Sequence, residues 1–392
     1  MADVKKVIGA GAVRQVASGA LLMGALGIAA RHMSSVEFST YNDRIILFYL
    51  LAAILGIPGY STIYKFLASS REETIGLRFP IYLTGTLAVL SVLAGACLKF
   101  IAGTDFYDAI GLSAMVVAAC LPALSLGLSR YRIFNIGELA PAITTLALVL
   151  LVRPHNAQEL LRCFYLGFAS KLLVYIYLAA TYKNIWGSTE GWASRLKEGS
   201  IVGLSGAIQT SAFRWLYLAS ILAVSAPVGV LIGAAYPFVE KLLVLPQAAN
   251  SIMFGRIVRD RPPLMALVKL YLLIFLVLSI GSFVVPYVLL LGERYYFGSG
   301  YAGISKYSRF LSLLFVLQGM RLMLHNYLQA WGRSVVVMCD STLMALVALV
   351  FYLLFKTGTK VSDFQVFLTI FIFYILSISI CFFAGRKCRN TV

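Results

Sequence analysis

Apolar runs separated by short polar connections repeat along the whole chain. Most runs are about 20 residues long, the length of α-helix that crosses the hydrocarbon core of a bilayer. They predict helices over residues 8–30, 45–66, 78–102, 108–129, 133–152, 159–182, 199–224, 228–254, 264–292, 305–331, 334–355 and 364–385. The longest connections, 31–44, 183–200 and 292–309, leave no room for a folded domain outside the membrane. The pattern therefore predicts an all-α integral membrane protein with about twelve transmembrane helices.

Composition strengthens this prediction. Of the 392 residues, 60% are hydrophobic and 12% are charged, and the mean hydropathy is +0.87. A soluble protein of this length could not cover so much apolar surface with polar groups. The net charge of +17 would indicate nucleic-acid binding in a soluble domain, but here we attribute it to membrane topology and expect no nucleic-acid partner.

The basic residues between the predicted helices also give an orientation. With the N-terminus in the cytoplasm, 17 of them fall on the cytoplasmic side and 10 on the other. Because basic residues gather in cytoplasmic loops, both termini are expected in the cytoplasm. The apolar stretch of the first helix is too long for a cleavable signal peptide, so we expect that helix to be retained.

The long connection 183–200 lies near the middle of the chain and suggests two halves of six helices each, 1–192 and 193–392. Transporters are often built from such repeats, with the substrate site between them. A faint internal similarity agrees with this division. "IPGYSTIYKF" (57–66) and "LPQAANSIMF" (245–254) each end a predicted helix, and they align Pro58 with Pro246 and Phe66 with Phe254.

Several charged residues fall inside the predicted helices. Away from the helix ends, six are basic and only three are acidic: Arg14, Lys171, Arg214, Lys241, Lys269 and Arg321 against Glu138, Glu240 and Asp340. A basic residue at the centre of a membrane helix costs roughly 2.5–3.5 kcal/mol on insertion scales. Lys269 and Arg14 could reach an interface by snorkelling, whereas Lys171, Arg214 and Arg321 lie nearer helix centres.

Helical geometry places several of these residues on polar faces. At about 100° per residue, Arg214 shares a face with Gln209 and Tyr217, while Trp215 lies on the opposite side. A second face holds Gln318, Arg321 and His325. Hydrogen bonding between packed helices would explain such faces. A water-filled cavity lined with cations, suited to an anion such as phosphate, explains the positive surplus as well.

Motifs of catalysis and metal binding are missing. There is no GxxxxGK[ST] sequence for ATP hydrolysis, and the three histidines lie in no HExxH or triad-like setting. The six cysteines form no CxxC pair. We therefore expect no catalytic residues, no metal and no cofactor, and we interpret Asp105 and Asp108 as a solvated turn.

In "GLSGAIQTSAFRWLYLASILAVSAPVGVLIGAAYPFVEKLLVLPQAANSIMFGRI" (203–257), a short loop is followed by Gly233, Ala234, Ala235 and Tyr236, and then by Leu245 and Pro246. This stretch resembles the seventh and eighth helices of Wzx-type polysaccharide flippases of the multidrug/oligosaccharidyl-lipid/polysaccharide exporter superfamily. "YLQAWGR" (327–333) is similar to the end of the family's tenth helix. "GIAARHMSSVEFSTYN" (27–42) resembles a diverged first loop, with Ser39 where glycine is usual.

The resemblance implies two six-helix lobes around a central cavity that opens to each leaflet in turn. It implies movement of an undecaprenyl-pyrophosphate-linked oligosaccharide to the outer leaflet of a bacterial inner membrane, for O-antigen, capsule or exopolysaccharide synthesis. A polysaccharide polymerase and a chain-length regulator would be partners beside membrane lipid. The residues that would line the basic cavity are Arg214 and Arg14 first, then Lys171 and Arg321, with Gln209, Tyr217, Gln318 and His325.

Two other functions stay open. A cation-coupled drug antiporter of the same superfamily should carry acids in its cavity. Arg14 and the lack of an acid in the first helix argue against that function, but Glu240, Asp340 and Glu138 could carry a coupling ion. A membrane polymerase or ligase is the enzymatic alternative. Such enzymes usually carry a sizeable catalytic outer loop, and no connection here is longer than residues 183–200.

Overall fold

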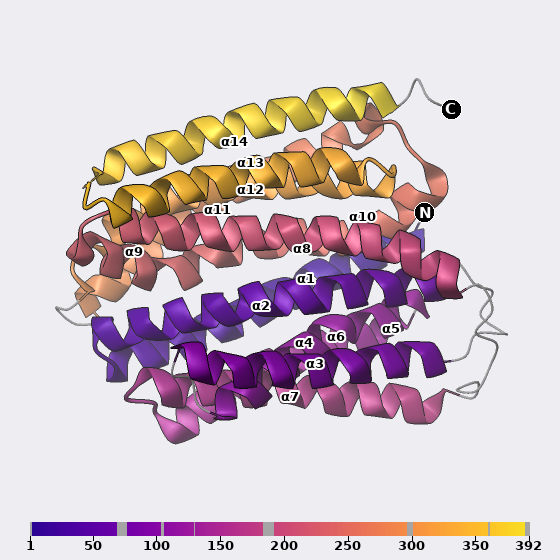
Figure 1. The fold of residues 1–392 in the computed structure, drawn as a ribbon, viewed down its shortest axis with the longest axis horizontal. Helices are drawn as coiled ribbons and strands as arrows, with labels where there is room; N and C mark the ends of the chain where they lie inside the picture. Colours follow the sequence, from indigo (N-terminus) through magenta and orange to yellow (C-terminus); the bar gives the residue numbers. More distant parts are fainter. Residues whose placement is uncertain are drawn as a thin grey trace. The chain divides into compact units, whose positions relative to one another are not determined.

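The computed structural model describes residues 2–68, 77–102, 106–128, 130–182, 192–295, 301–359 and 361–388, and it is helical (Figure 1). No β-strand occurs within these ranges. Most of the central connection, residues 183–191, and Asp105 lie outside the described residues. The all-α fold class predicted from the apolar runs is confirmed.

Ten of the twelve predicted helices are found as single, mostly longer helices. They are α1 (Ala2–His32), α2 (Ser35–Ala68), α3 (Arg78–Ala102), α6 (Tyr131–Val152), α7 (Ala157–Thr181), α8 (Trp192–Ala223), α11 (Leu264–Tyr295), α12 (Ile304–Ala330), α13 (Ser334–Lys356) and α14 (Asp363–Arg386). Their extra turns are more polar than their centres, so the hydropathy pattern marked the apolar part of each helix and missed the ends.

Two predicted helices are interrupted, and proline accounts for both breaks. The helix expected over 108–129 consists of α4 (Phe106–Cys120) and α5 (Pro122–Gly127). The helix expected over 228–254 consists of α9 (Ala226–Val239), a 3₁₀ turn η1 (Glu240–Leu243) and α10 (Val244–Asp260). Pro122 and Pro246 lack the N–H that would continue the α-helical hydrogen bonds. Glu240 is therefore the first residue of the 3₁₀ turn that follows α9.

By length and composition alone, nine segments of the described chain could cross a membrane. They cover every predicted span except α1, α8 and α12. Those three helices carry the arginines Arg14, Arg214 and Arg321, which are all buried in the protein. These three arginines therefore lie inside the protein and do not face lipid.

The chain separates into two compact units. Unit 1 comprises residues 1–43, 155–157 and 212–392, and unit 2 comprises residues 44–154 and 158–211. The division differs from the predicted boundary at 192/193, because α1 groups with the C-terminal helices and the first half of α8 with the N-terminal ones. The arrangement as two six-helix lobes around a cavity stays a prediction.

Unit 1 is organised around α12. This helix contacts α9, η1, α10, α11, α13 and α14. Two of them, α13 and α14, run side by side with α12 (Figure 1). Most side chains of α12 are buried, including Gln318, Arg321 and His325. A membrane helix enclosed by other helices can hold polar groups at a lower cost than one that faces lipid.

In unit 2, α8 approaches α2 closely through two glycines. A Cβ atom on Gly199 would lie 2.6 Å from Cα of Thr62, and one on Gly203 would lie 2.4 Å from Cα of Pro58. The glycines are four residues apart on α8, as are Pro58 and Thr62 on α2. Small residues at this spacing let the backbones of membrane helices pack together.

Replacing Gly203 with alanine is expected to destabilise the protein by about 1–3 kcal/mol, because the added methyl group must push two backbones apart. Alanine at Gly85, in the interior of α3, meets nothing within 4 Å and is the matched control. That change should leave stability unchanged or raise it by up to about 1 kcal/mol, since alanine favours helix. Thermal unfolding of the detergent-purified proteins measures both. Equal midpoints for the two variants would contradict the tight α2–α8 contact.

Candidate functional site

Arg214 lies in a buried polar cluster formed by α8, α9 and η1. Its Nη1 donates a hydrogen bond to the hydroxyl of Tyr236 at 2.5 Å, and its Nη2 forms an ion pair with Oε1 of Glu240. The ring of Tyr217 stacks close to that of Tyr236, with centroids 3.7 Å apart, and its hydroxyl donates to the carbonyl of Ile232. The structure thus brings together Arg214, Tyr217 and Glu240 from the predicted site.

Aromatic rings surround the charges of this cluster. The guanidinium carbon of Arg214 lies 5.7 Å from the ring centre of Tyr236, and Phe315 of α12 packs edge-on against that same ring. Trp215 contacts Tyr352 of α13 instead, with ring centroids 5.5 Å apart. Arg214 and Trp215 therefore contact different elements, while the polar, cavity-facing side of α8 stays a prediction.

Arg14 is also buried, with 4% of its surface exposed. It lies on α1, which packs against α10 within unit 1. Snorkelling to a lipid interface does not fit this burial. Lys269, for which snorkelling is the more natural expectation, is exposed near the start of α11.

A second buried cluster joins α12, α13 and α14. Arg321 is 0% exposed, and its Nε and Nη2 lie 2.8 Å and 2.6 Å from Oδ2 of Asp340. Nε also donates to the hydroxyl of Ser377 at 2.9 Å. Nε2 of His325 lies 2.8 Å from the same carboxylate oxygen. The guanidinium further reaches Gln318 at 3.4 Å, so the predicted face of α12 forms one network.

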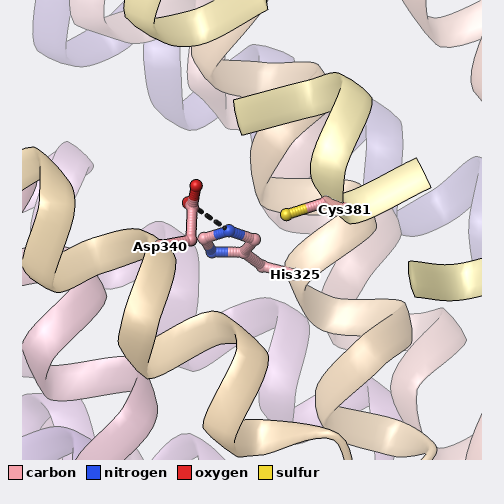
Figure 2. A group of neighbouring side chains, drawn as sticks. All are labelled: His325, Asp340 and Cys381. Carbon is pink, nitrogen blue, oxygen red and sulfur yellow. Dashed lines mark hydrogen bonds and ion pairs between the residues drawn. The ribbon is translucent and has the colours of Figure 1, made fainter. Parts of the chain in front are cut away.

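This second cluster contains ligand atoms that metals use. Figure 2 shows the imidazole of His325 between the carboxylate of Asp340 and the sulfur of Cys381, and their ligand atoms lie within 4.8 Å of one another. The guanidinium of Arg321 already occupies the carboxylate. A divalent cation at that oxygen would meet a fixed positive charge at contact distance. The donor set therefore does not fit a divalent metal site.

The third cluster is in unit 2. Nζ of Lys171 on α7 lies 2.5 Å from Oε1 of Glu138 on α6. The lysine side chain is 8% exposed and the glutamate 25%. Gln209 is buried in the same unit. Apart from Arg14 and Gln209, the predicted site residues are thus distributed over these three clusters.

The pairing changes the interpretation of the buried charges. Glu240, Asp340 and Glu138 each bind one of the bases that we expected to attract an anion. The expectation that Arg214, Arg321 and Lys171 need neutralisation from outside the chain is therefore corrected. The acids and bases are far apart in the sequence and meet only because their helices pack. Their assignment to substrate binding or ion coupling stays a prediction.

Sequence reasoning was wrong about Asp108. We expected it in a solvated turn, but it is 1% exposed at the start of α4. The hydroxyl of Tyr165 donates to its Oδ1 at 3.0 Å, and Nε2 of Gln158 lies 3.4 Å away. Its spacing of four from Leu112, a core residue, was the available signal, because residues four apart share a helix face.

Comparison with known proteins identifies similar folds. No protein-family profile matches the chain, and no curated protein matches its sequence. Solved structures do match. A MATE transporter in the straight conformation has a TM-score of 0.71, with 15% identity over 99% of this chain and 97% of the other. An outward-facing multidrug resistance MATE family transporter of the MOP superfamily gives 0.67 over the same shares.

Another similar structure is a MOP superfamily transporter from Pyrococcus furiosus, described by a binding pocket of reverse polarity that suggests a different function. Its TM-score is 0.65 and its identity 15%, over 99% of this chain and 97% of that one. At this level of identity the likeness concerns the fold. The chain is a multi-pass membrane protein with the all-α fold of MATE transporters of the MOP superfamily.

Proposed function

We propose that this protein is a cation-coupled transporter that moves its substrate across the membrane by alternating access. The observation that carries the proposal is the similarity over nearly the whole length of both chains to transporters of this fold. Structures described as outward-facing and inward-facing match almost equally well, with TM-scores of 0.67 and 0.66. Because similar folds are described in both states, they support a mechanism in which the substrate site opens to one side of the membrane and then to the other.

The buried ion pairs support coupling between a cation and a substrate. Arg214 and Glu240 neutralise each other in the present arrangement. A cation that binds Glu240 would release Arg214, and an anionic group that binds Arg214 would release Glu240. Because a buried charge is costly without a partner, these exchanges link the two binding events. Arg14 adds a further buried positive charge in the same unit.

The first substrate class is a small organic molecule, exported in exchange for a cation. The multidrug resistance transporters among the similar structures favour this class. The test uses purified protein in liposomes, the fluorescent organic anion Lucifer yellow, and an imposed proton or sodium gradient. We expect dye movement that follows the gradient and stops when an ionophore collapses it. Dye movement equal to that of protein-free liposomes under both gradients would contradict this substrate class.

The second substrate class is a lipid-linked oligosaccharide with a pyrophosphate group. The order of the segments around Gly233, Pro246 and Gly332 favours it, because these are the positions of the flippase resemblance. The test is deletion of the protein in its host, followed by location of the lipid-linked sugar unit. Accumulation on the cytoplasmic leaflet is expected for a flippase. Accumulation of unpolymerised units on the outer leaflet would indicate a polymerase.

A further inference from the structure

His325 has one ring nitrogen bound and one free. The side chain is 0% exposed in the interior of unit 1, and Nε2 lies 2.8 Å from Oδ2 of Asp340. Nδ1 is buried and has no hydrogen-bond partner among the described residues. Buried polar atoms are normally satisfied, so an unpartnered ring nitrogen at full burial calls for an explanation.

The charges around the ring define its protonation state. Asp340 is an acceptor at Oδ2, so a neutral imidazole must place its proton on Nε2 and donate it to that oxygen. Nδ1 then carries a lone pair and no proton. The guanidinium of Arg321 already balances the carboxylate. The network as it stands is neutral and has one empty proton-accepting position.

We propose that His325 Nδ1 binds the coupling proton of the transport cycle, in a site formed with Asp340 and Arg321. This inference rests on the proposed cation-coupled transport and adds a proton site on α12 to the cation exchange proposed at Glu240. A proton suits the site better than a metal ion, because it needs only the single lone pair of Nδ1, whereas a metal ion would need several ligand atoms beside the fixed charge of Arg321.

The groups next to the imidazole come from α12, α13 and α14. Arg321 on α12 and Asp340 on α13 are the charged ones. The sulfur of Cys381 on α14 lies within 4.8 Å of the ligand atoms of His325 and Asp340, and Tyr374 on the same helix interacts with Arg321 and Asp340. On α11, Tyr271 donates a hydrogen bond to the carbonyl of Met323, two residues before His325. The negative charge of Asp340 favours a protonated ring, whereas Arg321 and burial oppose it. The proton is therefore expected to bind when the packing around Arg321 loosens.

The geometry also shows how a proton would act on the helices. Arg321 and His325 share a single oxygen, Oδ2 of Asp340. An imidazolium makes a stronger bond to a carboxylate than neutral imidazole does and competes with the guanidinium for that oxygen. Arg321 also holds Ser377, so its release would weaken links from α12 to both α13 and α14. Proton uptake at one nitrogen would thus loosen three packed helices.

The first experiment detects the proton directly and needs no substrate. The chain has only three histidines, His32, His155 and His325, so histidine-selective ¹⁵N labelling of the whole protein in lipid nanodiscs gives a simple NMR spectrum. His325→Gln assigns the signal, and His155→Gln, at an exposed position, is the control. We expect Nδ1 of His325 to be unprotonated at high pH and to gain a proton as the pH falls. An Nδ1 that is protonated at high pH, or one that never titrates before the protein unfolds, would overturn the proposal.

The second experiment links the proton to transport. Liposomes containing a trapped pH indicator report proton flux while Lucifer yellow moves. His325→Gln keeps a donor toward Asp340 but cannot bind a proton, so dye exchange between equal pH values should continue while dye-linked proton flux falls to the protein-free leak. Unchanged proton flux, or loss of both activities in a normally folded variant, would refute the role. If the wild-type protein moves no dye, the substrate class fails while the NMR titration still tests the proton site.

Discussion

Replacing Asp340 with alanine is expected to cost about 3–5 kcal/mol of stability, because it leaves the charge of Arg321 buried without its carboxylate. The guanidinium is 0% exposed and bonds that carboxylate through two nitrogens. Ser377 and Gln318 can accept hydrogen bonds from it, but neither carries a charge to balance it. Folded yield and thermal unfolding of the purified membrane protein measure the loss.

A double replacement distinguishes the cost of leaving Arg321 without a balancing charge from the cost of losing the contact between the two side chains. Arg321→Met with Asp340→Leu removes both charges and keeps apolar volume, which is often neutral for a buried pair. We therefore expect the double variant to be more stable than Asp340→Ala alone. A double variant as unstable as the single one would mean that the pair contributes through its shape and hydrogen bonds more than through charge compensation.

The helices of this fold could be predicted because a bilayer imposes a length on each apolar run. The same pattern missed the breaks at Pro122 and in η1, since it measures hydropathy and is insensitive to a lost backbone hydrogen bond. It also could not assign α1 to unit 1, which depends on packing between helices distant in sequence.

The candidate site was predictable only within single helices. The shared face of Gln318, Arg321 and His325 followed from helical geometry, because three- and four-residue spacings bring side chains to one side. The partners Asp340 and Ser377 come from other helices, and no spacing along the chain indicates them. Counting acids and bases gave the right inventory of charges but could not say which pairs form.

Replacing Arg214 with alanine is expected to reduce transport at least about thirtyfold while protein remains in the membrane, since truncating one partner of a buried, hydrogen-bonded charge pair weakens binding by about 2–5 kcal/mol. The variant loses the ion pair with Glu240 and the hydrogen bond to Tyr236. Arg214→Lys should keep part of the activity, because the charge survives while the two-nitrogen geometry is lost. The measurement is initial transport rate per membrane-inserted protein, with the substrate that the liposome or deletion experiment identifies.

Variants of Glu240 distinguish two possible roles of Arg214. If Arg214 serves only to neutralise Glu240, then removing both charges, as Arg214→Gln with Glu240→Gln, should restore transport. If Arg214 instead binds an anionic group of the substrate, the double variant should stay inactive. The single variant Glu240→Gln should then bind substrate at least as tightly as the wild type, because the Glu240 carboxylate no longer competes for Arg214. We expect the second outcome. Arg214 already has an internal acid, so a substrate anion can reach it only by displacing that acid, which is the exchange that couples substrate binding to a cation on Glu240.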